Sequence, residues 1–414
     1  MRRVHVLVAA TLAALIAAPV QAAVEVKPYG FVLGTYTENF GQGNRTDNPT
    51  AANSENKANV GQNQTTSNFS ARGTRVGLKL SGGKGPMDSD LSGVIETDFN
   101  GVQDNATAGN QDYNSAPRIR LAYVQAKKGN QTFTFGQDWN LAFSPLNPTS
   151  LHHQMASIGT AAGNLWNRMI QLRWDADWMK GSDTDVVTKV AVVRPPTTDA
   201  TVTVGGSSEV AGSGDASGQP GYQGLVELHQ KLMGRDFVIG ASGSLIHHRY
   251  DAGLVAPITG TTNHGTDDGL IAIHAVLPVM EMVTVQAEGF YGRGTQSYKG
   301  LGTAFADNVA GSITGRYELS QGGWAQAMVT PMAGWHAGLF YGIENMSKAG
   351  LAVATAYRNQ NSMANVIWDV SPEMSLSVEG GMIQTNYVGN NNTATAGTQT
   401  GHMGYLGLAS QYKF

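Results

Sequence analysis

Three features of this chain predict an all-β fold, a 16-stranded antiparallel transmembrane β-barrel with an inward-folded third loop. The N-terminus has the layout of an export signal, apolar residues recur with period two, and long and short connections alternate between the predicted strands. Period-two alternation indicates strands with two unlike faces. Together the three features predict an exported β-protein whose strands connect on two different sides.

The first 22 residues, MRRVHVLVAATLAALIAAPVQA, predict a secretory signal peptide. Two arginines precede an apolar run from Val6 to Ala18, and the small-residue end predicts cleavage after Ala22. The alternative is a membrane anchor, but the run is well short of the ~20 residues needed to span a bilayer. We therefore expect residues 1–22 to be removed and residues 23–414 to form a single outer-membrane barrel.

The composition excludes several classes of protein. The chain has no cysteine, which excludes disulfides, a lipid-anchored cysteine and thiolate metal sites. Removing the signal takes away Arg2 and Arg3 and no acidic residue, so the net charge of −4 becomes −6 and nucleic acid is a poor partner. Glycine contributes 52 of 414 residues, about twice the usual ~7%. Because charged residues are only 14% and no later run reaches ~20 apolar residues, a soluble β-protein or a transmembrane barrel remains.

The alternation of side chains favours the barrel. In LSGVIETDF (91–99) the two carboxylates share one face, and in RIRLAYVQA (118–126) Ile119, Leu121 and Tyr123 oppose the two arginines. MIQLRWD (169–175) has the same pattern. A soluble sheet also alternates, but its polar face meets bulk water and carries many lysines and glutamates. This charge-poor, glycine-rich chain fits that class badly.

The spacing of the strands supports the same fold. We predict sixteen strands, at residues 26–38, 68–80, 90–100, 118–127, 131–138, 166–178, 185–194, 221–232, 235–248, 267–277, 281–292, 321–330, 334–345, 359–371, 373–387 and 401–414. Short turns such as KKGN, MGRD, PVME, PMAG and SPEM alternate with long connections at 39–67, 101–117, 139–165, 195–220, 249–266, 293–320 and 388–400. Short periplasmic turns, long outer loops and an even strand number are typical of a transmembrane barrel.

The C-terminus and the strand number extend this prediction to a channel in the outer membrane of a Gram-negative bacterium. GYLGLASQYKF alternates and ends on Phe414, which resembles the C-terminal signature of outer-membrane barrels. A closed barrel supplies every backbone amide with a partner inside hydrocarbon. About eight strands enclose only side chains, whereas about sixteen leave an aqueous lumen. Residues 23–414 are therefore long enough to form a channel.

The third long connection, residues 139–165, is the predicted constriction of this channel. It follows TFTF, in which Phe133 and Phe135 face outward to lipid or a neighbouring subunit. The connection is too apolar for a solvated loop and too rich in proline for a helix. We predict that it folds into the barrel and that Trp139, Phe143 and Trp166 pack against the inner wall.

Several segments resemble the DcaP-like family of trimeric outer-membrane channels. They are ARGTRVGLKL, GVIETDFNG, RIRLAYVQA, TFTFGQDWNLAFSPLNP, NRMIQLRW and GGWAQ. The resemblance is concentrated in residues 69–178, is weaker at 322–387 and the C-terminus, and is absent from 178–320. It implies a sixteen-stranded homotrimer, in contact with outer-membrane lipid and lipopolysaccharide, that passes small acidic solutes such as dicarboxylates and aromatic acids without a cofactor.

Strand alternation places one set of charged side chains inward near the third loop. The set comprises Arg75, Lys79, Glu96, Asp98, Arg118, Arg120, Asp138 and Arg173. Guanidinium groups in a narrow aqueous passage attract carboxylates and can hold them bidentately. Alternatively, the charges neutralise one another as cross-strand pairs. Both can hold because the cations outnumber the carboxylates, and we predict a weak anion preference. Arg72 and Arg168 fall on the outward parity, where a bulge could turn either inward.

Other functions have less support in the sequence. His152–His153 and His247–His248 could indicate a metal, but adjacent strand residues point to opposite faces and neither pair has an obvious third ligand. No nucleophile lies at a defined spacing from a base, so we expect neither a catalytic site nor an enzyme. The leading prediction is a passive porin for small hydrophilic solutes, favouring organic acids or dicarboxylates. The alternatives are a surface-exposed structural or adhesive barrel with a plugged lumen, and a monomeric substrate-specific channel.

Overall fold

The structure of the chain is a computed structural model. It describes residues 24–42, 49–53, 65–101, 116–143, 145–152, 157–179, 183–195, 213–232, 234–250, 264–301, 308–309, 312–313, 318–348, 351, 355–389 and 399–414. The predicted signal peptide and most of the predicted first loop lie outside these ranges. Among the described residues, no helix is both long and apolar enough to cross a membrane.

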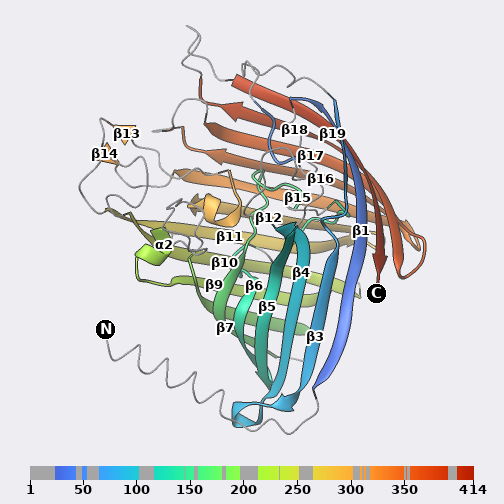
Figure 1. Ribbon diagram of the computed structural model, residues 1–414. Helices are drawn as coiled ribbons and strands as arrows, with labels where there is room; N and C mark the ends of the chain where they lie inside the picture. The colour runs from blue at the N-terminus through green and yellow to red at the C-terminus, as the bar shows by residue number, and fades with distance from the viewer. Residues whose placement is uncertain are drawn as a thin grey trace.

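The described residues form a closed barrel of sixteen strand positions, each antiparallel to its neighbours (Figure 1). The large strands are β1 (Glu25–Gly41), β2 (Thr66–Ser70), β3 (Arg75–Lys84), β4 (Asp90–Gly101), β5 (Ala116–Lys128), β6 (Gln131–Trp139), β7 (Arg168–Trp178), β8 (Thr184–Val193), β9 (Gly221–Leu232), β10 (Arg235–Tyr250), β11 (His264–Met280), β12 (Val283–Arg293), β15 (Leu319–Met332), β16 (Trp335–Met346), β17 (Ala356–Asp369), β18 (Met374–Tyr387) and β19 (Gln399–Lys413). β2 and β3 both pair with β1 and share one position, and β1 closes the barrel on β19. The predicted 16-stranded antiparallel barrel is confirmed.

Short elements lie in the turns and connections. They are η1 (Pro86–Asp88), α2 (Ser213–Ala216), η2 (Thr295–Tyr298), β13 (Asn308–Val309) and β14 (Ser312–Ile313). The predicted strand at 221–232 coincides with β9, and the other boundaries differ by a few residues. The predicted strand at 68–80 is instead broken between β2 and β3. β11 also continues through Pro278 to Met280, so the turn predicted at 278–281 lies at 281–282.

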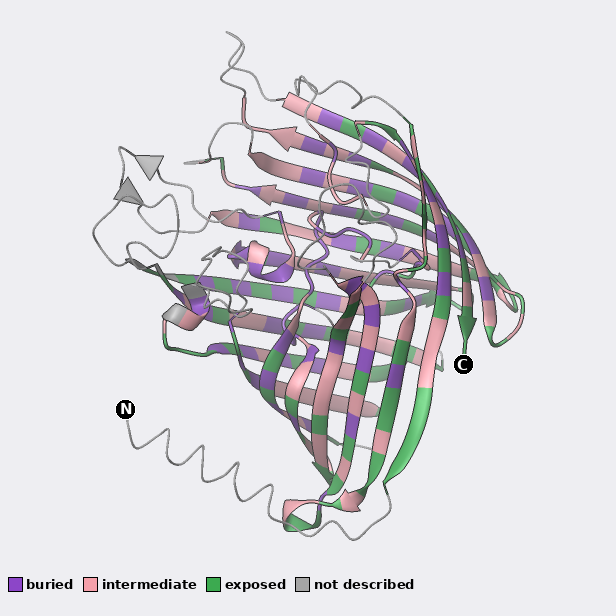
Figure 2. Ribbon diagram, in the orientation of Figure 1, coloured by how far each residue is buried: buried purple, intermediate pink, exposed green. Residues whose placement is uncertain are grey.

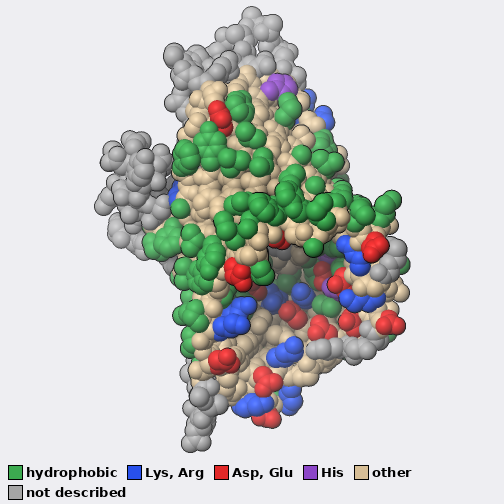
Figure 3. Space-filling view, turned by 90° about the vertical axis from the view of Figure 1, so that its right-hand side faces the viewer, with side chains coloured by type: hydrophobic (Ala, Val, Ile, Leu, Met, Phe, Trp, Pro, Cys, Tyr) green, Lys and Arg blue, Asp and Glu red, His purple; other side chains and the backbone are tan. Residues whose placement is uncertain are grey.

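The barrel wall has an apolar outer face and a polar inner face. On β17, Asn359 and Asn365 are at most 4% exposed, whereas Val366 is 44% exposed. The same alternation of buried and exposed residues runs along the other strands (Figure 2). Figure 3 shows hydrophobic side chains over the outer wall, and charged side chains in and around a hollow in the lower half of the view. This arrangement is the reverse of a soluble protein and suits a barrel surrounded by hydrocarbon.

A β-bulge in β5 changes the face of several side chains. Glu96 lies opposite Leu121, whereas the next residue of β4 lies opposite Ile119, so Arg120 is the extra residue. Residues directly opposite one another in an antiparallel pair point to the same face. Leu121 and Tyr123 therefore share the polar face with Glu96, and the prediction that they point outward with Ile119 was wrong.

Candidate functional site

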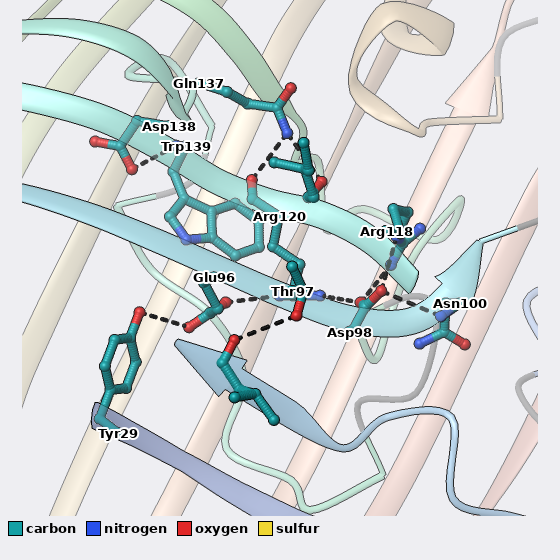
Figure 4. A network of polar contacts seen from close by, with 12 residues as sticks. Tyr29, Glu96, Thr97, Asp98, Asn100, Arg118, Arg120, Gln137, Asp138 and Trp139 are labelled. Atoms are coloured by element: carbon teal, nitrogen blue, oxygen red, sulfur yellow. Dashed lines mark hydrogen bonds and ion pairs between the residues drawn. The ribbon is translucent and has the colours of Figure 1, made fainter. Parts of the chain in front are cut away.

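Charged side chains of β4 and β5 form a connected network on the polar face (Figure 4). Arg118 Nη2 donates to Asp98 Oδ2 at 2.6 Å, and Arg120 Nη1 donates to the same oxygen at 2.7 Å. Arg120 Nε donates to Glu96 Oε1 at 2.8 Å, and the Tyr29 hydroxyl of β1 donates to Glu96 Oε2 at 3.2 Å. Asp98 is 1% exposed and Arg120 is 4% exposed. Charge-assisted bonds of this kind replace the water that the buried groups lose.

Two further groups flank this network. Arg173 on β7 donates through Nη1 to Asp138 Oδ2 at 2.8 Å, and its Nε lies 2.9 Å from Asp175 Oδ1. Lys79 Nζ lies 4.9 Å from the ring centroid of Tyr29. Tyr29 therefore connects the ammonium group to the carboxylate network of β4. Apart from Arg75, the predicted inward residues thus form one network around β3–β5 and a second around β6–β7.

Two arginines beside the network have aromatic rather than acidic neighbours. Arg75 Cζ lies 5.1 Å from the ring centroid of Phe31, and Arg168 Cζ lies 5.3 Å from that of Trp139. Within the described part of the chain, no Asp or Glu oxygen forms an ion pair with either guanidinium group. An aromatic face attracts a cation without cancelling its charge. Arg75 and Arg168 therefore leave the site with an excess of positive charge.

Arg168 lies at the site although strand alternation gives it the outward parity. It lies opposite Trp139 at the ends of β6 and β7, and β5 pairs with β6 only as far as Gln137. The same Trp139 ring lies 5.8 Å from Arg120 Cζ. Two guanidinium groups therefore share one indole, which places Arg168 beside the β4–β5 network. No bulge is needed to bring Arg168 to the site, because the pairing of β5 with β6 ends at Gln137, before Trp139 and Arg168.

The connection from β6 to β7, residues 140–167, contacts strands far away in the barrel order. Leu141 N donates to Gln223 Oε1 on β9 at 2.9 Å, and Thr149 N donates to Gln326 Oε1 on β15 at 2.6 Å. Ser150 Oγ donates to a carboxylate oxygen of β18 at 2.5 Å. These acceptors are at most 4% exposed and belong to the polar face of their strands. The connection thus lies against that face from β9 to β18.

Apolar residues hold the two ends of this connection. Phe143 is fully buried among residues of β9, β10 and β11, and its ring centroid lies 4.5 Å from that of Tyr298. Trp166 is 5% exposed, and its ring N–H donates to Thr160 Oγ1 at 2.8 Å. Trp139 belongs to β6 itself and lies 6.1 Å from Trp166. Phe143 therefore contacts the wall, whereas the two tryptophans contact each other.

A second connection, residues 294–301 between β12 and β15, supports the first. Tyr298 is fully buried, and its hydroxyl accepts from Gln223 Nε2 at 3.1 Å. Trp166 N donates to Tyr298 O at 2.9 Å, and Ala161 N donates to Lys299 O at 3.1 Å. Lys299 has a left-handed backbone with φ 60°, a conformation that costs energy for a residue with a side chain. Burial lowers the pKa of Lys299, and the neighbouring arginines 168 and 118 lower it further.

This second connection was not predicted. Residues 293–320 were expected to form one outer loop, and an aromatic residue between two glycines in GTQSYKG is only a weak signal of burial. The packing of residues 49–53 was not predicted either, and there Ala52 N donates to Thr385 Oγ1 at 2.9 Å. Asn359 Nδ2 donates to Thr50 O at 2.7 Å. In the described part of the chain, these three connections therefore pack on the polar face, and only 139–165 was predicted to do so.

Acidic residues on the opposite wall are bound by these connections. Glu344 on β16 is fully buried and accepts from Leu301 N at 2.8 Å and from Ser320 Oγ at 2.9 Å. Glu379 on β18 is 1% exposed and accepts from Ser150 Oγ. Their carboxylate oxygens accept hydrogen bonds from protein groups rather than from solvent. Glu288 on β12 is a third buried acid on that side of the barrel.

The histidine pairs lie apart from this site. His247 Nδ1 lies 2.6 Å from Asp267, on a side chain that is 32% exposed, and His248 Nε2 lies 2.9 Å from Asp268, where both side chains are 2% exposed. The two rings thus point to opposite faces, as adjacent strand residues do. His152 is buried, and His153 lies outside the described residues. Across the described ranges, no three such side chains converge as metal ligands.

Comparison with known proteins shows the fold. No protein-family model matches the chain, and no curated protein is similar to it. The outer membrane channel DcaP of Acinetobacter baumannii superposes with a TM-score of 0.64 at 20% identity, covering 95% of this chain and 98% of that one. An anion-selective porin from Comamonas acidovorans gives 0.56 at 12% identity, covering 95% and 100%. The trimer form of OmpT from Vibrio cholerae gives 0.51 at 11% identity, also covering 95% and 100%. The chain has the barrel fold of these outer-membrane proteins.

Proposed function

We propose that this chain is a passive porin of the Gram-negative outer membrane, through which small hydrophilic solutes diffuse. A closed barrel of sixteen strand positions with a polar interior is wide enough for an aqueous lumen. The apolar outer face suits hydrocarbon. The shared fold with an outer membrane channel and with an anion-selective porin supports the same function. Export then requires residues 1–22 as a signal peptide that is removed.

The proposed porin prefers small organic acids over cations. The observation that carries this preference is the excess positive charge of Arg75 and Arg168, which have aromatic neighbours instead of carboxylates. Arg118 and Arg120 lie next to them and are paired with Asp98 and Glu96, so the surplus charge is that of Arg75 and Arg168. A solute carboxylate entering this region gains attraction to several guanidinium groups at once. A dicarboxylate gains this attraction to guanidinium groups at both of its carboxylates.

The narrowest part of the proposed channel lies between this cationic wall and the packed connections. Residues 140–167 lie along the polar face from β9 to β18, and residues 294–301 support them. We assign the predicted pore-lining residues to this passage, with Arg173 and Asp138 beside it. Lys299 joins the cationic side from the second connection. The remaining gap selects solutes by size and charge.

The proposed assembly is a homotrimer in contact with lipid and lipopolysaccharide. One of the similar structures is described as a trimer form, which supports this assembly. A porin trimer presents three equivalent lumens, so channel recordings should show conductance steps in groups of three. A monomeric substrate-specific channel would show single steps.

The test is a pair of measurements on the purified, folded protein. Reversal potentials in planar bilayers under unequal KCl should show anion preference, and liposome swelling should be faster with dicarboxylates than with sugars of similar size. Strong cation selectivity would contradict the proposed preference while leaving a porin. A barrel that conducts no ions would contradict the porin itself and favour a plugged structural or adhesive barrel.

A further inference from the structure

A hollow of about 320 Å³ lies on the polar inner face of the barrel, away from the proposed constriction. Its lining comes from β4–β9, at the ends of these strands that are joined by short turns. Asp175 on β7 belongs to the lining, and Arg168 of the constriction lies seven residues earlier on the same strand. At about 3.3 Å per residue, the two positions are about 23 Å apart along β7. A solute therefore meets the hollow and the constriction at different points of its path.

Two lysines in the lining have no acidic partner. They are Lys127 on β5 and Lys189 on β8, and among the described residues neither ammonium group forms an ion pair. Lys189 lies opposite Asp175, but Asp175 Oδ1 lies 2.9 Å from Arg173 Nε. Lys127 lies opposite Asp90, whose carboxylate is bound at 2.7 Å by a lysine of β3. Both ammonium groups can therefore receive the carboxylate of a solute.

An acidic side chain without a partner lies in the same hollow, nearer the short turns. Asp177 is two residues beyond Asp175 on the same face of β7, and in the described part of the chain its carboxylate forms no ion pair. Glu227 on β9 lies in the same cross-strand row as Asp177, but its oxygens lie 2.9 Å from His274 Nε2 and 3.2 Å from His229 Nε2. Two residues along a strand span about 7 Å. The hollow thus presents ammonium groups in one row and a carboxylate in the next.

We infer that this hollow is a binding site for a short amino acid, a solute that carries a carboxylate at one end and an ammonium group at the other. The inference rests on the porin proposed above and adds a substrate class to it. The carboxylate of the solute reaches Lys127 and Lys189, and its ammonium group reaches Asp177. A dicarboxylate would place its second carboxylate beside Asp177, and a diamine would place an ammonium group beside a lysine, so like charges oppose both. The volume is at the lower end of the range for small-molecule sites, about 300–1,000 Å³.

Three solutes provide a matched set of probes. γ-Aminobutyrate, butyrate and butylamine have the same carbon chain and differ in which charges they carry. Each is added to the reconstituted channel on the side of the short turns, and its dissociation constant is measured from the block of the ion current. γ-Aminobutyrate should bind more tightly than butyrate or butylamine, because it alone has a partner of opposite charge for both of its ends.

Two substitutions separate the two ends of the site. Asp177→Asn should weaken γ-aminobutyrate by about two- to fivefold, as expected for the loss of one exposed ion pair, and should not weaken butyrate. Lys189→Gln should weaken γ-aminobutyrate and butyrate alike, and should not weaken butylamine. The matched controls are Asp236→Asn and Lys231→Gln, because these two residues pair with each other in the β9–β10 hairpin, outside the hollow. Both controls should keep the wild-type constants.

The outcomes distinguish this site from the porin itself. Equal binding of the three probes to a conducting channel would overturn the inference and leave the porin. The same holds for an Asp177→Asn channel with the wild-type constant for γ-aminobutyrate, or for controls that weaken this probe as much as Asp177→Asn does. A folded wild-type barrel that conducts no ions would remove the proposed porin and the inference together. Heat-modifiable migration on a denaturing gel shows that each variant barrel is folded before it is compared.

Discussion

Replacing Arg75 by glutamine tests the origin of the proposed anion preference. Arg75 lies on the polar face of β3, and in the described residues its guanidinium group has no acidic partner. The substitution therefore removes one uncompensated charge without leaving a buried carboxylate unpaired. Glutamine also keeps part of the side-chain volume over Phe31. The expected change is in selectivity rather than in folding.

The size of the effect follows from Coulomb's law. A unit charge passing at ~6 Å interacts with the guanidinium by about 0.7 kcal/mol at the dielectric constant of water, and by about 2.8 kcal/mol at an effective value of about 20. In the proposed aqueous lumen the lower figure applies, because salt screens over about 10 Å at 0.1 M. A loss of about 0.7 kcal/mol corresponds to about a threefold fall in the attraction of the anion, and because a cation is relieved of an equal repulsion, the anion-to-cation permeability ratio should fall by up to about tenfold.

The assay is the reversal potential of the reconstituted channel under a KCl gradient at low ionic strength. The matched control is Lys84→Gln, because Lys84 lies on the same strand but is exposed and pairs with Asp90 at 2.7 Å beside the short turn. The control should leave the permeability ratio unchanged. If Arg75→Gln and Lys84→Gln give the same ratio as the wild type, the cationic surplus at β3–β7 does not determine selectivity.

Substitutions at three further residues probe the same site. Asp98→Asn should lower the free energy of unfolding by about 3–5 kcal/mol, because Arg118 and Arg120 lose a shared buried partner. The same substitution should raise the anion-to-cation permeability ratio. Urea titration measures the loss of stability, and reversal potentials measure the gain in anion preference. Tyr298→Ala should remove about 3–5 kcal/mol of packing and enlarge the single-channel conductance, whereas Tyr298→Phe should leave it nearly unchanged. Lys299 is charged below its pKa, which burial and neighbouring arginines lower, so raising the pH into the alkaline range should weaken anion preference earlier than an ordinary lysine would. Lys299→Gln should flatten that pH dependence, and an unchanged slope would exclude Lys299 from the passage.

The strands could be predicted because their information is local. Alternation with period two and turn residues at short intervals fix a strand whatever its neighbours are, and β9 therefore coincides with its predicted range. The pairing of Arg118 with Asp98 follows the same local logic, since the two strands are joined in a single hairpin. The bulge at Arg120 is the exception. One inserted residue reverses the parity of Tyr123, and no sequence pattern marked it.

The connections could not be predicted to the same depth, because their contacts are distant in the sequence. Thr149 contacts Gln326 across 177 positions, and Ala52 contacts Thr385 across 333. Composition indicates that such segments avoid bulk water, but it does not identify the partner strand. Tyr298 shows the difficulty, since its buried hydroxyl bonds to a donor on β9, Gln223, and to the Ser244 hydroxyl on β10, which only the closed barrel brings together.

The net charge of the chain therefore predicts little about selectivity. The mature sequence is expected to be acidic, yet Glu344 and Glu379 are buried and accept hydrogen bonds from residues of the packed connections. These acids hold the connections in place and are shielded from a passing ion. Arg75 and Arg168, by contrast, are stacked on aromatic rings that leave their charge uncompensated. The electrostatic potential in the proposed constriction depends on which charged side chains lack a partner of opposite charge there. An acidic chain can therefore form an anion-preferring passage.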